Sequence, residues 1–275
     1  SIIAIFLCNS WNYRNDKMVL MNLLNNLFFK FKRKILSKTI YKNNFKTPDF
    51  FKYFFSQEKK KFIVQVGGND GLQNDPLRQF LMNKGNYSTI IFEPIKYYYD
   101  QLCDLYKNRE DIKLENFYVS NENLNKKIYY LNPKICNELN GEGFFDNWAH
   151  GLGSFDKDSI FKAIDDNSFR GKNYINNIKR FKENIIHEYV KSFQLKNINF
   201  PINTSNLLVI DVQGFELEVL ESLSFKEKID YIVYEDEKPS SIKSKKIRNL
   251  LVKNRFKLIG RLTWLDQIYF KKYEF

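Results

Sequence analysis

Apolar and polar positions follow two different spacings along the chain from residue 61 onward. Short continuous apolar runs are typical of buried strands, whereas apolar residues three and four positions apart are typical of helices that cover a sheet. Strands are predicted at residues 62–66, 89–92, 113–119, 127–131, 207–212, 231–235, 256–262 and 267–271. Helices are predicted at residues 75–84, 97–106, 216–223 and 242–253. This alternation predicts an α/β fold with a mostly parallel sheet.

The last two predicted strands differ from the others because only residues 263–266 separate them. A parallel crossover needs roughly a dozen residues or more, so these two strands are expected to form an antiparallel hairpin. The sheet is therefore expected to end in an antiparallel strand.

Residues 133–172 lack a clear period, although a helical pattern returns from about residue 159 and more clearly at residues 175–181. A long irregular segment inside a compact domain more often carries function than not. No internal repeat and no change in composition divides the chain after residue 50. We therefore predict one domain at residues 51–275, preceded by an N-terminal extension at residues 1–50.

The extension combines apolar and basic residues at positions 21–38, and two interpretations remain open. The segment is either a helix that packs its apolar face on the domain or a basic amphipathic helix that binds peripherally to an anionic membrane surface. No apolar run approaches the roughly 20 residues that a membrane-spanning helix needs.

The chain carries 44 Lys and Arg residues against 32 Asp and Glu residues, a formal charge of +12. These basic residues are spread along the chain rather than gathered in one dense stripe, so no nucleic-acid partner is expected. Cys8, Cys103 and Cys136 are widely spaced and form no CxxC pair, which suggests neither a zinc site nor a disulfide framework. A cytoplasmic location is the simplest expectation.

A glycine-rich turn follows the first predicted strand. Gly67, Gly68 and Gly71 lie where the backbone must turn sharply and approach a ligand closely. Glu93, at the end of the next strand, is placed to accept hydrogen bonds from ribose hydroxyls. The glycine spacing departs from the G-x-G-x-x-G dinucleotide fingerprint and favours S-adenosylmethionine. The alternatives are a nicotinamide-dependent oxidoreductase and a plain strand-to-helix turn capped by the glutamate.

The segment LLVIDVQGFELEVL, residues 207–220, is a second strand-turn-helix pattern that carries acidic residues. Asp211 ends an apolar strand, Gly214 permits the turn, and Glu216 opens a helix. Ligands bind at the carboxyl ends of strands in an open α/β sheet, so Asp211 is a candidate site residue. Glu216 has an alternative explanation, since an acidic residue complements the dipole at the start of a helix.

These motifs resemble the FkbM family of S-adenosylmethionine-dependent methyltransferases. The late motif is similar to the family's apolar strand followed by Asp-x-Glu-Gly-x-Glu or Asp, then Val-Leu or Ile-Leu. Residues 65–71 and 75–77 are similar to a branch with Gln-x-Gly-x-Asn-Asp-Gly and Asp-Pro-Leu, and WAHGLGSFDKDSI, residues 148–160, resembles that branch as well. The resemblance implies a class I methyltransferase fold, Rossmann-like and doubly wound, and methyl transfer commonly to a hydroxyl of a sugar or polyketide.

By position, the resemblance also implies roles for individual residues. It places these residues in the cofactor site: Gln65, Gly67, Gly68, Asn69, Asp70, Gly71, Glu93 and Asp211. Glu93 would hold the ribose, and Asp211 would face the reaction centre. Two residues depart from the family pattern: Gly68 stands where Ala is usual, and Gln213 stands where Glu is usual, which removes a charge beside the site.

Methyl transfer to an alcohol requires a positioned acceptor and removal of a proton. Asp211, Glu235 and His150 are the predicted catalytic residues, and Asp156 is a further candidate base. Asp211 and Glu235 could also hold magnesium together with Glu216, but their spacing does not require a metal, and none is expected.

A hydroxylated small molecule or glycan is the expected acceptor. Its pocket is expected from residues 133–205, where Phe144, Phe145 and Trp148 would stack on a sugar ring or form a small core. Gln213 motivates a non-enzymatic alternative, a degenerate domain that binds cofactor or glycan without turnover.

Overall fold

The computed structural model describes residues 48–72, 75–141, 151–166, 172–236, 239–262 and 266–272. Contacts divide the chain into two units, Ser1–Asn44 and Phe45–Phe275, and all described residues belong to the second unit. The helix predicted within residues 21–38 lies outside the described residues, and the domain boundary at residue 50 stays a prediction. None of the described helices is long and apolar enough to cross a bilayer.

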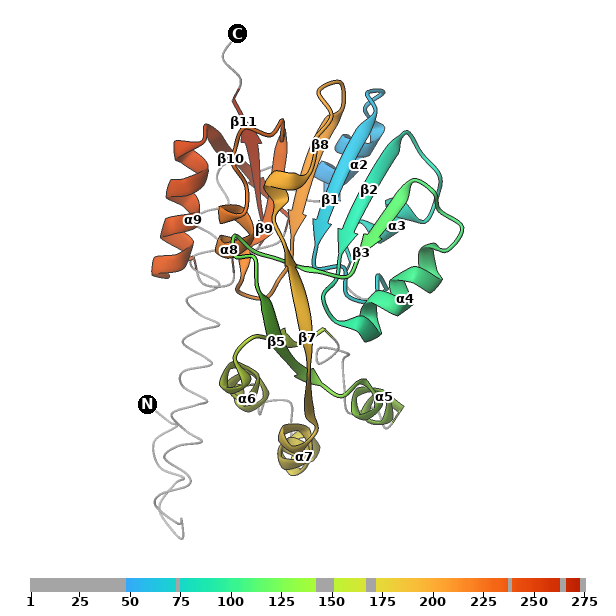
Figure 1. Ribbon diagram of the computed structural model, residues 1–275, viewed down its shortest axis with the longest axis vertical. Helices are drawn as coiled ribbons and strands as arrows, with labels where there is room; N and C mark the ends of the chain where they lie inside the picture. The colour runs from blue at the N-terminus through green and yellow to red at the C-terminus, as the bar shows by residue number, and fades with distance from the viewer. Residues whose placement is uncertain are drawn as a thin grey trace, which may run out of the picture. The chain divides into compact units, whose positions relative to one another are not determined.

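A seven-stranded sheet forms the centre of this unit, in the order β10-β11-β9-β8-β1-β2-β3 (Figure 1). Its strands are β1 (Lys61–Val66), β2 (Tyr87–Phe92), β3 (Ile112–Glu115), β8 (Ser205–Ile210), β9 (Tyr231–Glu235), β10 (Phe256–Arg261) and β11 (Asp266–Lys271). Neighbours from β3 to β9 run parallel, and β11 runs antiparallel to both β9 and β10. The structure confirms the predicted mostly parallel sheet with an antiparallel C-terminal strand.

Helices cover both faces of this sheet because its central strands are apolar on both sides. The covering helices are α2 (Pro48–Ser56), α3 (Arg78–Leu81), α4 (Lys96–Tyr106), α8 (Glu216–Glu221) and α9 (Ile242–Lys253). Side chains of α8 and α9 join the core around Val64 and Leu208 on one face. Side chains of α2, α3 and α4 join the core around Ile63 and Leu207 on the other face. The fold is therefore doubly wound, as predicted.

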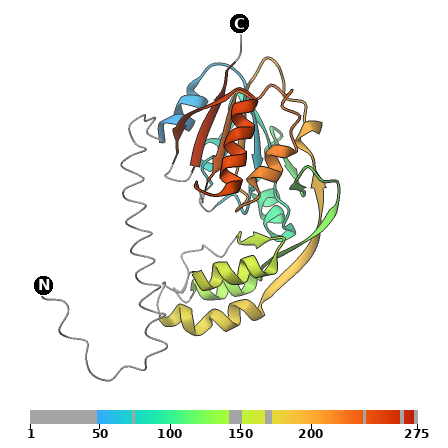
Figure 2. The ribbon, with the colours of Figure 1, turned by 90° about the vertical axis from the view of Figure 1, so that its left-hand side faces the viewer.

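A second sheet of four strands, in the order β4-β7-β5-β6, belongs to the middle of the chain. Its elements are β4 (Tyr118–Val119), β5 (Asn125–Leu131), α5 (Pro133–Gly141), β6 (Gly153–Ser154), α6 (Lys157–Asp166), α7 (Lys172–Glu183) and β7 (Ile185–Phe193), and a short 3-10 helix, η2 (Leu195–Asn197), follows. Strands β5 and β7 form a long antiparallel ribbon, and the three helices lie at its far end from the central sheet (Figure 1 and Figure 2).

The ribbon is joined to the start of α4. The carboxylate Oε1 of Glu188 in β7 accepts a hydrogen bond from the backbone N–H of Lys96 at 2.8 Å. Ile128 and Val190, from the same face of the ribbon, share a small core with Ile95. Because α4 starts at the carboxyl end of β2, these contacts hold the ribbon beside the end of the central sheet where ligands bind in such folds.

This second sheet is the main departure from the sequence-based prediction. The strand predicted at residues 113–119 is two strands, β3 and β4, in different sheets. Between them, the side-chain Nδ2 of Asn116 donates to the carbonyls of Glu93 and Pro94, both at 2.9 Å, and fixes the turn. Strand β7 was not predicted, because Glu188 interrupts the alternation of its inward-facing positions.

Two other predictions of local structure are corrected. Helix α5 occupies part of the segment that was expected to be irregular, whereas α6 and α7 lie where the helical pattern was predicted to return, from about residue 159 and at residues 175–181. Apolar residues of these helices bury against each other and the end of the ribbon. The helix predicted at residues 75–84 contracts to α3. Asp75 Oδ1 accepts the backbone N–H of Leu77 at 2.8 Å, which holds this segment in a turn, and Pro76 cannot donate to a helix.

Candidate functional site

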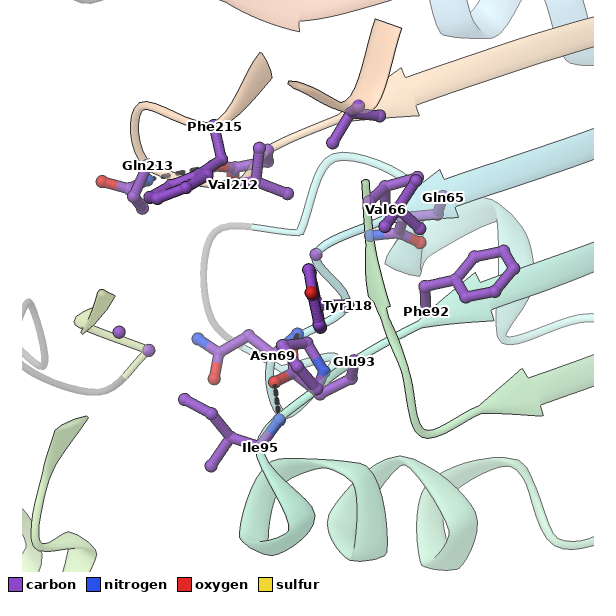
Figure 3. A pocket seen from close by; sticks show the side chains of 18 of the residues that line it. Gln65, Val66, Asn69, Phe92, Glu93, Ile95, Tyr118, Val212, Gln213 and Phe215 are labelled. Atoms are coloured by element: carbon purple, nitrogen blue, oxygen red, sulfur yellow. Dashed lines mark hydrogen bonds between the residues drawn. The ribbon is translucent and has the colours of Figure 1, made fainter. Parts of the chain in front are cut away.

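A cleft of about 480 Å³ lies at the carboxyl ends of β1, β2 and β8, where the second sheet meets the central one. Its wall includes the glycine turn after β1, the end of β2, β4, the loop around β6 and the turn after β8. Figure 3 shows Asn69, Glu93 and Ile95 together on one side of the cleft, and Gln213 and Phe215 on the other. The volume is that of a small-molecule site.

The glycine turn requires a residue without a side chain at Gly67. Its φ angle is +89°, and a Cβ atom added there would lie 1.8 Å from the backbone oxygen of Asp211. The N–H groups of Gly67 and Gly68 both donate to the carbonyl of Phe92, at 3.0 and 3.1 Å. The turn thus connects the ends of β2 and β8 and leaves its backbone in the cleft wall.

Glu93 fixes this turn from the end of β2. Its Oε2 accepts the backbone N–H of Asn69 and its Oε1 accepts the backbone N–H of Ile95, both at 2.8 Å. The residue is 5% exposed, and burial raises the pKa of its carboxyl to about 7, although these backbone hydrogen bonds act in the opposite direction. Each carboxylate oxygen has a second lone pair, so Glu93 can still accept hydrogen bonds from a ligand.

Gln65 and Asp75 form a second polar group in the cleft wall. The Nε2 of Gln65 donates to Asp75 Oδ1 at 3.3 Å. Burial raises the pKa of Asp75 to about 6; hydrogen bonds from Leu77 and Gln65 lower it, and the charge of Asp211 raises it further. Gln65 Oε1, Asp75 Oδ2 and Asn69 Oδ1 are enclosed and have no hydrogen-bond partner among the described residues.

A third group lies at the exposed edge of the cleft, after β8 and β9. The Nε2 of Gln213 donates to Asp211 Oδ1 at 3.0 Å and to Glu235 Oε2 at 3.2 Å. Gln213 therefore links the carboxylates at the ends of two neighbouring strands. Glu216 has a local role instead, because its Oε1 accepts the backbone N–H of Gly214 at 2.8 Å and its side chain is buried.

The structure brings most of the predicted cofactor residues into one wall. These residues line the cleft: Gln65, Gly67, Gly68, Asn69, Glu93 and Asp211. Asp70 and Gly71 do not line it. Asp70 Oδ1 accepts the N–H of Leu72 at 2.8 Å, and Gly71 packs against Leu102 and Leu105 of α4, so both shape the turn from behind.

The predicted catalytic residues have different positions. Asp211 is in the cleft wall, and Glu235 is joined to it through Gln213. His150 lies outside the described residues, as do the predicted stacking residues at 144, 145 and 148. Asp156 is exposed and caps α6, where its carboxylate accepts hydrogen bonds from the N–H and hydroxyl of Ser159 at 3.1 and 2.7 Å.

Aromatic residues from three separate segments line the cleft, and the sequence did not predict this wall. The ring centroid of Phe155 lies 4.9 Å from that of Tyr118 and 4.9 Å from that of Phe215. Phe155 belongs to the Ser-Phe-Asp run and Phe215 to the late motif, so the motifs contained a signal for both. Tyr118 carried none, because its position depends on the break between β3 and β4.

The cleft is acidic, although the whole chain is basic. Asp75, Glu93 and Asp211 line it, whereas no Lys, Arg or His is among the described residues of its wall. Such a surface suits a ligand that brings hydrogen-bond donors or positive charge, whereas phosphates are usually bound by Arg, Lys or helix N-termini. Across the described part of the chain, no group of three or more His, Cys, Asp or Glu side chains could hold a metal ion.

The chain was compared with known protein families, curated proteins and solved structures. The solved structures that it matches include the methyltransferase FkbM from Methylobacillus flagellatus, with 10% identity and a TM-score of 0.41; the match covers 77% of this chain and 43% of that chain. Another is the ribosomal protein L11 methylase from Lactobacillus delbrueckii subsp. bulgaricus, with 10% identity and a TM-score of 0.36. That match covers 79% of this chain and 73% of the methylase chain. This chain thus spans less than half the length of the M. flagellatus protein.

The comparison with curated proteins finds no match. The family model of the methyltransferase FkbM domain, in contrast, matches residues 65–258, which include the glycine turn, Glu93, the second sheet and the late motif. The match covers well over half of the sequence. The chain therefore belongs to the FkbM methyltransferase domain family.

Proposed function

We propose that the cleft binds S-adenosylmethionine and that the protein transfers its methyl group to a hydroxyl of a sugar, a glycan or a related small molecule. The observation that carries the first part is the set of cleft carboxylates, Asp75, Glu93 and Asp211, with no basic side chain among the described residues of the wall. S-adenosylmethionine has a sulfonium, an ammonium and ribose hydroxyls, which provide positive charge and donors. When bound, it supplies an electrophilic methyl group.

The side chains of the cleft suit distinct parts of this task. Glu93 is held by two backbone N–H groups at the end of β2 and presents its remaining lone pairs for ribose hydroxyls. The exposed Asp211 and the linked Glu235 are the carboxylates available to accept a hydroxyl proton. The wall of Tyr118, Phe155 and Phe215 offers ring faces for a sugar and restricts water.

Calorimetry tests cofactor binding directly. We expect S-adenosylmethionine and S-adenosylhomocysteine to bind with micromolar dissociation constants, and NADH not to bind, because a pyrophosphate finds no cation in the described wall. Gly67→Trp should abolish binding, since even a Cβ atom clashes there. Met82→Trp, at an exposed position outside the wall, is the matched control and should bind as wild type does. Tight binding of NADH by the wild type would favour an oxidoreductase instead.

The acceptor is tested by mass spectrometry. Wild-type protein is incubated with trideuteromethyl-labelled S-adenosylmethionine and a panel of sugars, glycosides and polyols, and an O-linked labelled methyl group is the expected product. Labelling of amines or thiols only would contradict transfer to a hydroxyl.

Substitution of Gln213 tests the alternative that the domain binds its ligand without turnover. If Gln213→Glu creates a turnover that the wild type lacks, the natural domain is a degenerate binder. If the wild type turns over and Gln213→Glu is slower, the amide link between Asp211 and Glu235 belongs to the working enzyme.

A further inference from the structure

The ribbon of β5 and β7 (Figure 1) has two faces, and one of them takes part in the cleft. Successive residues of a strand point to opposite faces. Ile128 lines the cleft and shares a core with Val190, so this is the inner face. The opposite surface, here called the outer face, consists of Asn125, Lys127 and Tyr129 of β5 and their cross-strand partners Lys191, Tyr189 and His187 of β7. None of these six residues lines the cleft.

Three rings lie together on the outer face. The ring centroid of His187 lies 5.7 Å from that of Tyr129 and 6.5 Å from that of Tyr189. Tyr189 is 70% exposed and His187 is exposed as well, whereas Tyr129 packs partly against the core of the three helices and is held in place there. A single exposed ring needs no explanation, but neighbouring exposed rings are typical of an interaction surface.

The outer face also carries positive charge. Lys127 Nζ lies 5.9 Å from the ring centroid of Tyr129 and 5.5 Å from that of Tyr189, and Lys191 is exposed. None of the six residues is acidic. Glu188 of the same strand points to the inner face, where it binds the start of α4. The charge of the outer face therefore complements an anionic partner.

Several kinds of partner fit this surface poorly. A second copy of the chain would bring the lysines of both copies together across a two-fold interface. An apolar peptide would find no aliphatic side chain among the six residues. Single-stranded nucleic acid presents a phosphate at every nucleotide, and its binding grooves follow that backbone with a row of basic residues. The outer face offers two lysines at separate positions instead.

An anionic oligosaccharide matches both kinds of group on the outer face. The rings offer faces for the C–H side of a sugar ring, and a lysine ammonium makes a charge-assisted hydrogen bond to a carboxylate, sulfate or phosphate. The steps from Asn125 to Tyr129 span about 14 Å, which suits a chain of several sugars better than a single one.

We propose that the outer face of the β5–β7 ribbon binds an anionic oligosaccharide. The site goes beyond the proposed function, because it lies on the opposite side of the ribbon from the cleft residue Ile128 and needs no S-adenosylmethionine. It would hold a glycan chain while the cleft acts on a hydroxyl.

The test compares charged and neutral oligosaccharides by calorimetry on the full chain. The anionic ligands are the galacturonate hexamer and maltohexaose that bears sulfate or phosphate groups. Unmodified maltohexaose is the neutral reference, and hexauridylate represents nucleic acid. We expect the wild type to bind at least one anionic hexasaccharide with a submillimolar dissociation constant, and maltohexaose about tenfold more weakly or worse.

Two variants assign the binding to the outer face. Tyr189→Ala removes an exposed ring, and Lys127→Gln combined with Lys191→Gln removes both charges. Each variant should bind the anionic hexasaccharide about fivefold more weakly or worse. Tyr53→Ala, at a tyrosine of α2 that is 49% exposed, is the matched control for the lost ring and should bind as wild type does.

The control for the lost charges is Lys245→Gln combined with Lys246→Gln, at two exposed lysines of α9, which should also bind as wild type does. The proposal is overturned if no anionic hexasaccharide binds, if maltohexaose binds equally well, or if both outer-face variants keep full affinity. Binding of hexauridylate alone would overturn it in favour of a nucleic-acid surface.

Binding of S-adenosylhomocysteine is measured on the same proteins to separate this site from the cleft. The outer-face variants should keep the wild-type affinity for it, and a loss of both ligands would mean that the substitutions disturb the fold rather than a surface site. If the wild type binds the hexasaccharide but not S-adenosylhomocysteine, the proposed function fails and the outer-face site stands.

Discussion

Replacement of Glu93 by Gln tests whether a buried charge sets the stability of the cleft. The two carboxylate oxygens accept the backbone N–H groups of Asn69 and Ile95, both at 2.8 Å. Gln has the same shape but carries no charge, and only one of its terminal atoms accepts a hydrogen bond. The protonated carboxyl group has the same limitation, so Glu93→Gln imitates the low-pH state of the wild type.

The magnitude follows from the pKa of Glu93. Burial raises it from 4.5, the ordinary value taken for the unfolded chain, to about 7 in the fold. The folded state therefore keeps its proton where the unfolded chain has lost it, and the free energy of unfolding falls as pH rises from 4.5 to about 7. The difference between the two pKa values corresponds to about 3 kcal/mol. Well below pH 4.5 the carboxyl is neutral in both states, and this cost vanishes.

Urea unfolding of both proteins from about pH 4 to about pH 8.5 measures this cost. Between the acidic and the basic end of this pH range, we expect the free energy of unfolding of Glu93→Gln to rise by about 3 kcal/mol relative to that of wild type. The reason is that Gln has no ionised form to bury. Asp75, whose pKa burial raises to about 6, adds a slope in the same direction to both proteins, so it cancels in the difference. The exposed Glu110→Gln should follow the wild-type curve.

This reasoning would be refuted if the difference in the free energy of unfolding between Glu93→Gln and wild type stayed constant within about 0.5 kcal/mol over the whole pH range. A constant difference would mean that the three-dimensional surroundings stabilise the Glu93 carboxylate as well as water does. Added S-adenosylhomocysteine should reduce the pH slope of the wild type, because ribose hydroxyls would donate to the charged form.

Three further predictions concern the rest of the site. Gly67→Ala places a Cβ against the backbone of Asp211 at φ +89°, so a loss of about 2–4 kcal/mol in thermal unfolding is expected, and wild-type stability would contradict the clash. In Gln213→Glu, a third negative charge takes the place of the amide that links Asp211 and Glu235. This charge raises the pKa of a neighbouring carboxylate, so the acidic limb of the pH-rate profile should move to higher pH. An unmoved limb would argue against Asp211 or Glu235 as the base. Asp156→Ala removes the cap of α6 and should lower the melting temperature while methyl transfer continues, whereas loss of turnover in the folded variant would identify Asp156 as the base.

The central sheet and two of the site motifs were predictable because each depends on residues close together in the chain. Apolar runs locate β1, β2, β8 and β9. The short link between β10 and β11 determines the antiparallel pairing of those two strands. Gly67 and Asp211 were identified because a sharp turn and a strand end leave local signals. The second sheet was not predicted, because β7 carries Glu188 at an inward position and Asn116 splits one apolar run into two strands.

The sequence by itself determined that an open α/β sheet presents a glycine turn, an acid after β2 and an acid after β8 at one edge. Only the tertiary structure decided that Asp75 shares a wall with these groups, that Gln213 links two strand ends, and that Tyr118 joins an aromatic wall. The physical reason is that such contacts depend on which strands become neighbours. The order that puts β8 beside β1 is decided by burial of both sheet faces at once, which no single segment encodes.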